Sequence, residues 1–163
     1  MIEPLRMDIT KLAPDAYKHL LALEEAIAGR VDKHLLHLVK VRASQINGCA
    51  FCIGMHTDEA LRDGEKPERL LLLEAWHESS AFSEQERAAL EWVEEITLID
   101  DGHAHKEAFD ALKPHFSEEE IAWLTLAAAM INTWNRIAIS SRAQYDRAQF
   151  HRQATAEKVA EPA

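Results

Sequence analysis

The sequence predicts an all-α protein that forms a single domain over residues 1–163. Hydrophobic residues make up 47% of the chain, and there are only five glycines and five prolines. Leu, Ala, Glu, Lys and Arg dominate, and these are strong helix formers, whereas runs of β-branched residues are sparse. A chain of 163 residues is also long enough to bury a sizeable core within one domain. We therefore expect about seven helices and no sheet.

The first half of the chain divides into an arm and four helices. Residues 1–14 contain Pro4 and Pro14 and are expected to form an extended arm. The expected helices span residues 15–28, closed by Gly29, and 33–46, capped by Asp32. The next runs from Cys49 to Arg62 after the Asn47-Gly48 break, and the fourth starts at Pro67.

Two capping boxes mark helix starts in the second half, Ser83 with Glu86 and Ser117 with Glu120. The helix after the first is expected to point Ala89, Leu90, Val93, Ile96 and Leu98 inward and Glu91, Glu94 and Glu95 mostly outward. After a turn at 100–102, a short helix covers 104–113. The longest helix covers 118–147, and its centre from Leu124 to Ile139 is apolar almost all round, which is typical of a bundle centre or an oligomer interface. Residues 148–163 form a charged peripheral tail.

The charge balance excludes several classes of partner. The formal net charge is −10, so the chain lacks a basic stripe that could neutralise nucleic-acid phosphates or bind an anionic membrane. The most apolar run, 124–131, is too short to span a bilayer, and the N-terminus lacks the pattern of a signal peptide. We expect a cytoplasmic protein, and in that compartment a lone C-x-x-C indicates catalysis or metal binding before a structural disulfide.

Both cysteines of the chain, Cys49 and Cys52, form this C-x-x-C motif, and His56 follows one helical turn later. Helix entry at Gly48 favours the thiolate of Cys49 through the positive end of the helix dipole. His56 lies four residues after Cys52 and can accept the Cys52 proton. Dipole reasoning thus favours Cys49 as the reactive thiol and histidine reasoning favours Cys52, so the residues leave the order open.

A zinc site and a pair of inert buried cysteines are the two alternatives to redox chemistry. Cys49, Cys52, His56 and His37 supply enough ligand types for zinc, but three of them would come from one helix and no second ligand pair follows. Two inert buried cysteines are disfavoured by the adjacent Gly48 and Asn47. We therefore expect thiol redox chemistry with no metal and no cofactor.

The motif Ser44-Gln45-Ile46-Asn47-Gly48-Cys49-x-x-Cys52-x-x-x-His56-Thr57 resembles the signature of the alkylhydroperoxidase AhpD-like proteins of the carboxymuconolactone decarboxylase superfamily. The segments 38–43 and 131–136 fit the same pattern, so the similarity spans a core of about residues 30–140. The resemblance implies an all-helical homotrimer or homohexamer that reduces organic hydroperoxides. It implies Cys52 as the attacking thiol, Cys49 as the resolving and more exposed thiol, and His56 as part of a proton relay. A lipoyl dithiol or a thioredoxin-like protein is the implied reductant.

The chain departs from this family pattern at one position. The family glutamate twelve residues before the first cysteine is replaced by His37, which becomes a candidate relay base. Glu91 and Glu95 are the other candidates for a relay carboxylate. Two further functions fit the same fold: a redox sensor without turnover, and a decarboxylase or lactone-processing enzyme, although members of the latter kind typically lack the C-x-x-C. Asn132, Asn135 and Arg136 interrupt an apolar helix, and we expect them to hydrogen-bond a helix end or a subunit interface.

Overall fold

The computed structural model describes residues 3–148. Helices joined by short turns and loops make up this range, and it contains no β-strand. The elements are α-helices and one 3₁₀ helix, η1. Their bounds are α1 Ile9–Leu12, α2 Pro14–Ala28, α3 Lys33–Ile46, α4 Ala50–Arg62, α5 Pro67–Leu72, η1 Leu73–Glu78, α6 Glu84–Thr97, α7 Ile99–Gly102, α8 Lys106–Leu112 and α9 Glu118–Ser141.

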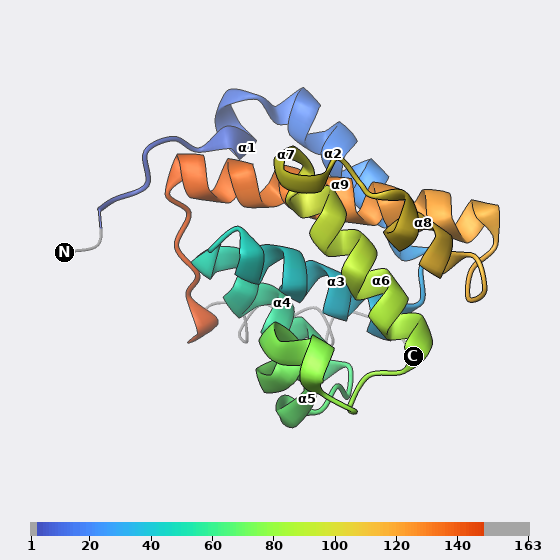
Figure 1. The fold of residues 1–163 in the computed structure, drawn as a ribbon. Helices are drawn as coiled ribbons and strands as arrows, with labels where there is room; N and C mark the ends of the chain where they lie inside the picture. Colours follow the sequence, from blue (N-terminus) through green and yellow to red (C-terminus); the bar gives the residue numbers. More distant parts are fainter. Residues whose placement is uncertain (1–2, 149–163) are drawn as a thin grey trace, which may run out of the picture.

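Helix α9 is the centre of the packing. Figure 1 shows α2 on one side of α9 and α3 and α4 on the other, with α6 crossing in front, and α9 contacts all four helices. The main core lies between α3, α6 and α9 and includes Val39, Val93, Leu124 and Ile131. The all-α prediction is confirmed, and the buried asparagines of α9 hydrogen-bond to the end of α3 and to Thr97 at the end of α6.

Several helix ends differ from the expected ones for local reasons. Helix α9 ends at Ser141 rather than 147, because Arg142 adopts a left-handed conformation (φ 60°) and its N–H bonds back to the carbonyls of Ala138 and Ile139. The fourth expected helix changes from α5 to the 3₁₀ helix η1 after Leu72, and Ala75 within η1 leaves helical geometry. Leu98 is 44% exposed instead of inward, because it caps the end of α6.

The outer face of α9 is less buried than its apolar composition predicts. Leu126 is 41% and Ile139 is 48% exposed. These two side chains point in different directions from the helix axis, so solvent reaches α9 at two separate places.

The arm before α2 is not wholly extended. Asp8 caps the short helix α1, and Pro14 opens α2 rather than breaking the chain. The Arg6 N–H donates to the Ser141 carbonyl oxygen at 2.8 Å, so the arm is attached to the C-terminal end of α9. Most of the expected charged tail, from residue 149 on, lies outside the described residues.

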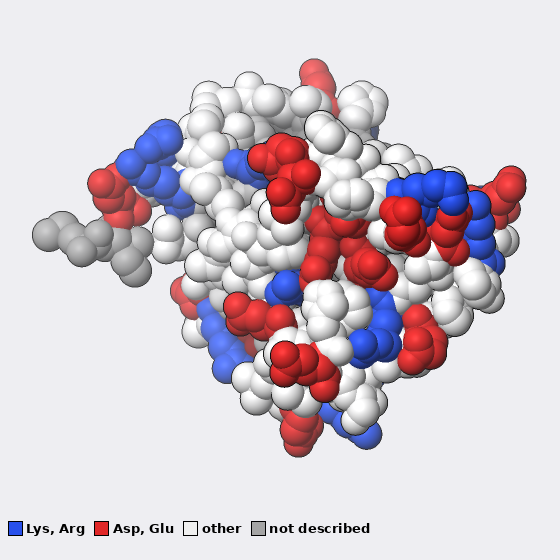
Figure 2. All heavy atoms as spheres, viewed as in Figure 1, with Lys and Arg blue, Asp and Glu red and all other residues white. Residues whose placement is uncertain are grey.

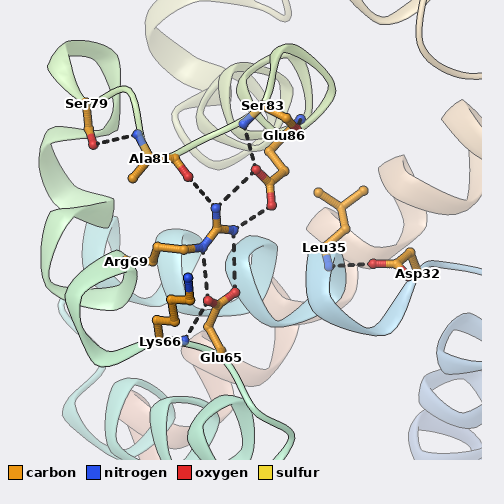
Figure 3. A network of polar contacts seen from close by, with 9 residues as sticks. All are labelled: Asp32, Leu35, Glu65, Lys66, Arg69, Ser79, Ala81, Ser83 and Glu86. Carbon is orange, nitrogen blue, oxygen red and sulfur yellow. Dashed lines mark hydrogen bonds and ion pairs between the residues drawn. The ribbon is translucent and has the colours of Figure 1, made fainter.

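A partly buried cluster of charged side chains connects α5 to α6 (Figure 3). The Arg69 guanidinium lies between Glu65 and Glu86, at 2.9 Å and 2.5 Å, and also donates to the Ala81 carbonyl oxygen. It stacks over the Phe82 ring at 5.0 Å. Because the Glu65 side chain is only 6% exposed, its charge depends on Arg69 for compensation.

The surface shows mixed charge. On the face seen in Figure 2, acidic groups are interspersed with fewer basic ones, and the basic groups do not join into a continuous patch. Within residues 3–148, none of the helices has both the length and the apolar character needed to cross a bilayer.

Candidate active site

The turn between α3 and α4 is held from α9. Gly48 takes a left-handed conformation (φ 66°), which lets the chain reverse between the two helices. The Asn47 side-chain nitrogen lies 2.9 Å from Asn132 Oδ1 and 2.8 Å from Asn135 Oδ1, and the Asn135 amide donates to Ser44 Oγ at 3.0 Å. The expected hydrogen bonding of the α9 asparagines to a helix end is therefore confirmed. These bonds hold the turn beside α9, so that Cys49, which follows Gly48, packs against Ala138 of α9.

The two cysteines form a buried, free dithiol. Cys49 is the N-cap of α4, and its sulfur accepts the Cys52 N–H at 3.4 Å. The two Sγ atoms lie 2.6 Å apart, and each cysteine is only 1% exposed. A disulfide can therefore close with a small movement of sulfur, without a change in the helix.

The environment gives the two thiols different acidities. A hydrogen bond from the Cys52 thiol lowers the pKa of Cys49 to about 7, with help from the backbone N–H groups of Cys52 and Phe51 and from Asn135, and against the opposing effect of burial. Donation of that same bond, together with burial, raises the pKa of Cys52. The negative charge of the dithiol therefore rests on Cys49 at neutral pH, as the dipole reasoning predicted.

His56 completes the group on the same face of α4. It is 4% exposed, and its Nδ1 lies 2.7 Å from Glu59 Oε2, while its Nε2 is buried without a hydrogen-bond partner. An Nδ1–H donated to the carboxylate leaves the Nε2 lone pair free to accept a proton. Burial acts to raise the pKa of Glu59, but the hydrogen bond and charge of His56 and the charges of Lys40 and His37 lower it overall.

Two cavities approach the dithiol from different directions. The larger, of about 580 Å³, is lined by Cys52, His56 and Glu59 together with parts of the arm, α2 and α9. The other, of about 510 Å³, is lined by Cys49 and by residues 142–145, which follow α9. The Tyr145 hydroxyl donates to the buried Asp58 carboxylate at 2.5 Å and holds this segment over α4.

The structure brings three of the four predicted site residues, Cys49, Cys52 and His56, together. His37 is buried but does not line either cavity; its Nε2 lies 2.8 Å from Asp63, and its pKa is lowered by burial against the effect of that carboxylate. The implied greater exposure of Cys49 is wrong for this chain, because the end of α9 and the segment 142–145 cover it. The dithiol is equally buried at both sulfurs.

Sequence reasoning missed Glu59 and looked for the carboxylate on α6. Glu91 there is exposed, and Glu95 pairs with His105 at 3.0 Å, away from the thiols. The available signal was the spacing of Glu59, which lies three residues after His56 and so on the same helical face. Among the described residues, no three His, Cys, Asp or Glu side chains converge as a metal site.

Comparison with known proteins identifies the family. Residues 14–95 match the model of the carboxymuconolactone decarboxylase family. The chain is also 38% identical over 136 residues to the uncharacterized protein YdfG of Bacillus subtilis, a match covering 83% of this chain and 92% of that protein. The chain belongs to the carboxymuconolactone decarboxylase family.

Solved structures agree with this assignment to the family. The chain superposes with a TM-score of 0.85 and 43% identity on ATU0492 of Agrobacterium tumefaciens, a protein of unknown function with a suggested antioxidant defence role as AhpD, covering 88% of this chain and 99% of that one. A complex of the debrominase Bmp8 with 2,3,4-tribromopyrrole has a TM-score of 0.73 at 22% identity, over 92% of this chain and 79% of that one, and shows the common fold. The AhpD-like helical fold of this chain is thus common to both structures.

Proposed function

We propose that this protein is a thiol-dependent peroxidase that reduces organic hydroperoxides with the Cys49–Cys52 dithiol. The observation that carries the proposal is a buried pair of free thiols 2.6 Å apart whose Cys52 member shares a cavity with the unpartnered Nε2 of His56. A thiol, a base and a second thiol in contact with the first are the parts that peroxide reduction requires. The family membership and the suggested antioxidant role of ATU0492 support the same proposal.

The reaction begins at Cys52. A water molecule in the shared cavity carries the Cys52 proton to His56 Nε2, and the Cys52 thiolate attacks the hydroperoxide ROOH, forming an S–O bond and breaking the O–O bond. His56 returns the proton to the leaving alkoxide, so the products are the alcohol ROH and the sulfenic acid of Cys52. Glu59 is a positioning residue in this step, because it holds the imidazole in the tautomer that keeps Nε2 free.

The second half of the cycle uses Cys49. Its thiolate attacks the Cys52 sulfenic sulfur and forms the S–S bond, and the S–O bond breaks as the hydroxide takes a proton from solvent and leaves as water. A lipoyl or thioredoxin-like dithiol then reduces the disulfide and becomes oxidised itself. The lowered pKa of Cys49 suits this role, since a resolving thiol must be ionised when the sulfenic acid appears.

The proposal is tested by following cumene hydroperoxide with dihydrolipoamide as electron donor in the wild type and in Cys52→Ser and Cys49→Ser. We expect repeated turnover in the wild type, no consumption by Cys52→Ser, and one equivalent consumed by Cys49→Ser with a sulfenic acid that dimedone traps. Glu91→Gln, at an exposed position of α6, is the matched control for folding. Hydroperoxide consumption by Cys52→Ser at the wild-type rate would contradict the proposal, and reversible oxidation without turnover would favour a redox sensor.

The acidity of Cys49 gives a second test. Alkylation of the wild-type dithiol by iodoacetamide should rise with pH around a midpoint of about 7, because the thiolate forms as the pH passes the lowered pKa of Cys49. Cys52→Ala removes the largest cause of that lowering, so its midpoint should move to higher pH. An unchanged midpoint in the variant would show that Cys52 does not stabilise the Cys49 thiolate.

We also propose that the chain assembles as a homotrimer or homohexamer, as its resemblance to AhpD-like proteins implies. Leu126 on α9 is an exposed apolar side chain that a neighbouring subunit would cover. Light scattering after size exclusion measures the assembly, and a monomer at micromolar concentration would contradict it.

A further inference from the structure

The cavity at Cys52 has a mostly apolar wall drawn from distant parts of the chain. Its volume of about 580 Å³ is in the range of pockets that enclose drug-sized ligands. The apolar lining comes from the arm, α2, α4 and α9, and includes Leu5, Met7, Leu21, Phe51, Trp134 and Ile137. The arm is part of this wall because Arg6 is bonded to the end of α9. A small hydroperoxide leaves most of this apolar surface in contact with water, whereas a bulky one covers it.

The charged groups of the lining leave no cation for an anionic substrate. Lys40 is the sole lysine or arginine among the described lining residues, and its ammonium is already paired with Glu24, which also accepts the Trp134 Nε1–H at 2.9 Å. The Lys40 side chain is 12% exposed, so this pair is held largely away from water. A substrate carboxylate would have to displace Glu24 to reach the lysine.

The remaining ionisable groups of the lining add negative charge. Glu59 is paired with His56, Asp8 lies 3.1 Å from the exposed Lys11, and Glu25 is exposed at the edge of the cavity. With Glu24 and Lys40 included, the charges of the lining sum to a negative value in either charge state of His56. A ligand that brings its own carboxylate therefore loses hydration and gains repulsion.

We infer that the cavity takes a bulky, uncharged apolar hydroperoxide and discriminates against the same hydroperoxide when it carries a carboxylate. This inference rests on the proposed peroxidase function and names its substrate class. Two electrons from the dithiol reduce ROOH to ROH and water, and the cavity selects only the R group. The carboxylates of the lining act on binding, not on the sulfur chemistry.

The test uses two substrates of nearly equal shape, methyl 4-(2-hydroperoxypropan-2-yl)benzoate and the corresponding free benzoate, at pH 7.5. For the wild type we expect kcat/KM to favour the ester by about tenfold, the effect of one unfavourable charge contact in a partly solvated site. Glu25→Lys places a cation at the edge of the cavity and should reduce this ratio severalfold, whereas Glu91→Lys, on an exposed face of α6, makes the same charge change away from the cavity and should not. Equal kcat/KM for acid and ester in the wild type, or an equal change of the ratio in both variants, would overturn the inference.

A binding measurement separates this inference from the proposed function. The two alcohols that correspond to these hydroperoxides cannot react, and their affinity for the reduced protein is measured by calorimetry. Tighter binding of the ester alcohol without any hydroperoxide turnover would support the substrate class of the cavity and refute the peroxidase. Turnover with equal affinities and equal kcat/KM for the two forms would refute the substrate class alone.

Discussion

Substitution of Glu59 by glutamine tests whether the His56–Glu59 pair acts in catalysis. The change keeps the shape of the side chain and removes its charge, 2.7 Å from the imidazole nitrogen. Two unit charges at that distance interact by about 6 kcal/mol at an effective dielectric constant near 20 and by about 1.5 kcal/mol in water. Because the Glu59 side chain is 25% exposed, we expect a loss toward the lower end, about 2–3 kcal/mol of transition-state stabilisation, or about 30- to 150-fold in kcat/KM.

The assay is the consumption of cumene hydroperoxide with dihydrolipoamide, measured from pH 5 to 9. In the wild type, the contribution of Glu59 should be present across this whole range, because its pKa is lowered and protonation removes the charge only at more acidic pH. Glu91→Gln makes the same chemical change at an exposed site of α6 and should leave the rate unchanged. A Glu59→Gln enzyme within twofold of the wild type at every pH would refute the relay, and the loss of rate should appear in kcat and not in KM.

Two further predictions concern stability. Arg69→Met leaves Glu65 buried without its partner and should destabilise the fold by about 3–5 kcal/mol in urea denaturation, whereas Lys113→Met at an exposed pair should cost less than about 1 kcal/mol; equal midpoints for the two variants would contradict the role of the cluster. Gly54→Ala would place a methyl group 2.4 Å from the Tyr145 ring, so it should destabilise the protein by about 1–3 kcal/mol and speed the alkylation of the dithiol. In a Tyr145→Ala background, which removes the clash, the further change Gly54→Ala should cost little additional stability, and an undiminished cost would place the strain elsewhere.

Local chemistry made much of the fold predictable. Asp32, Ser83 and Ser117 cap the helices that were expected to follow them, because capping depends on residues within one turn. The end of the last helix was misplaced by six residues, since the left-handed Arg142 carries none of the usual Gly or Asn signal. The kink at Ala75 likewise carries no Gly or Pro signal, and the next residue, Trp76, is buried in a core cluster.

At the site, the sequence by itself determined the dithiol, its position at a helix start and the histidine one turn later, because all three lie within eight residues of one helix. Only the tertiary structure decided what surrounds them. Burial of both sulfurs, the anchoring of the turn by Asn135, and a cavity walled by the arm and α9 all arise from contacts between residues far apart in the chain. The pairing of Glu59 with His56 is local, because three residues separate them on α4, whereas only the packing shows that Glu95 of α6 pairs with His105 instead.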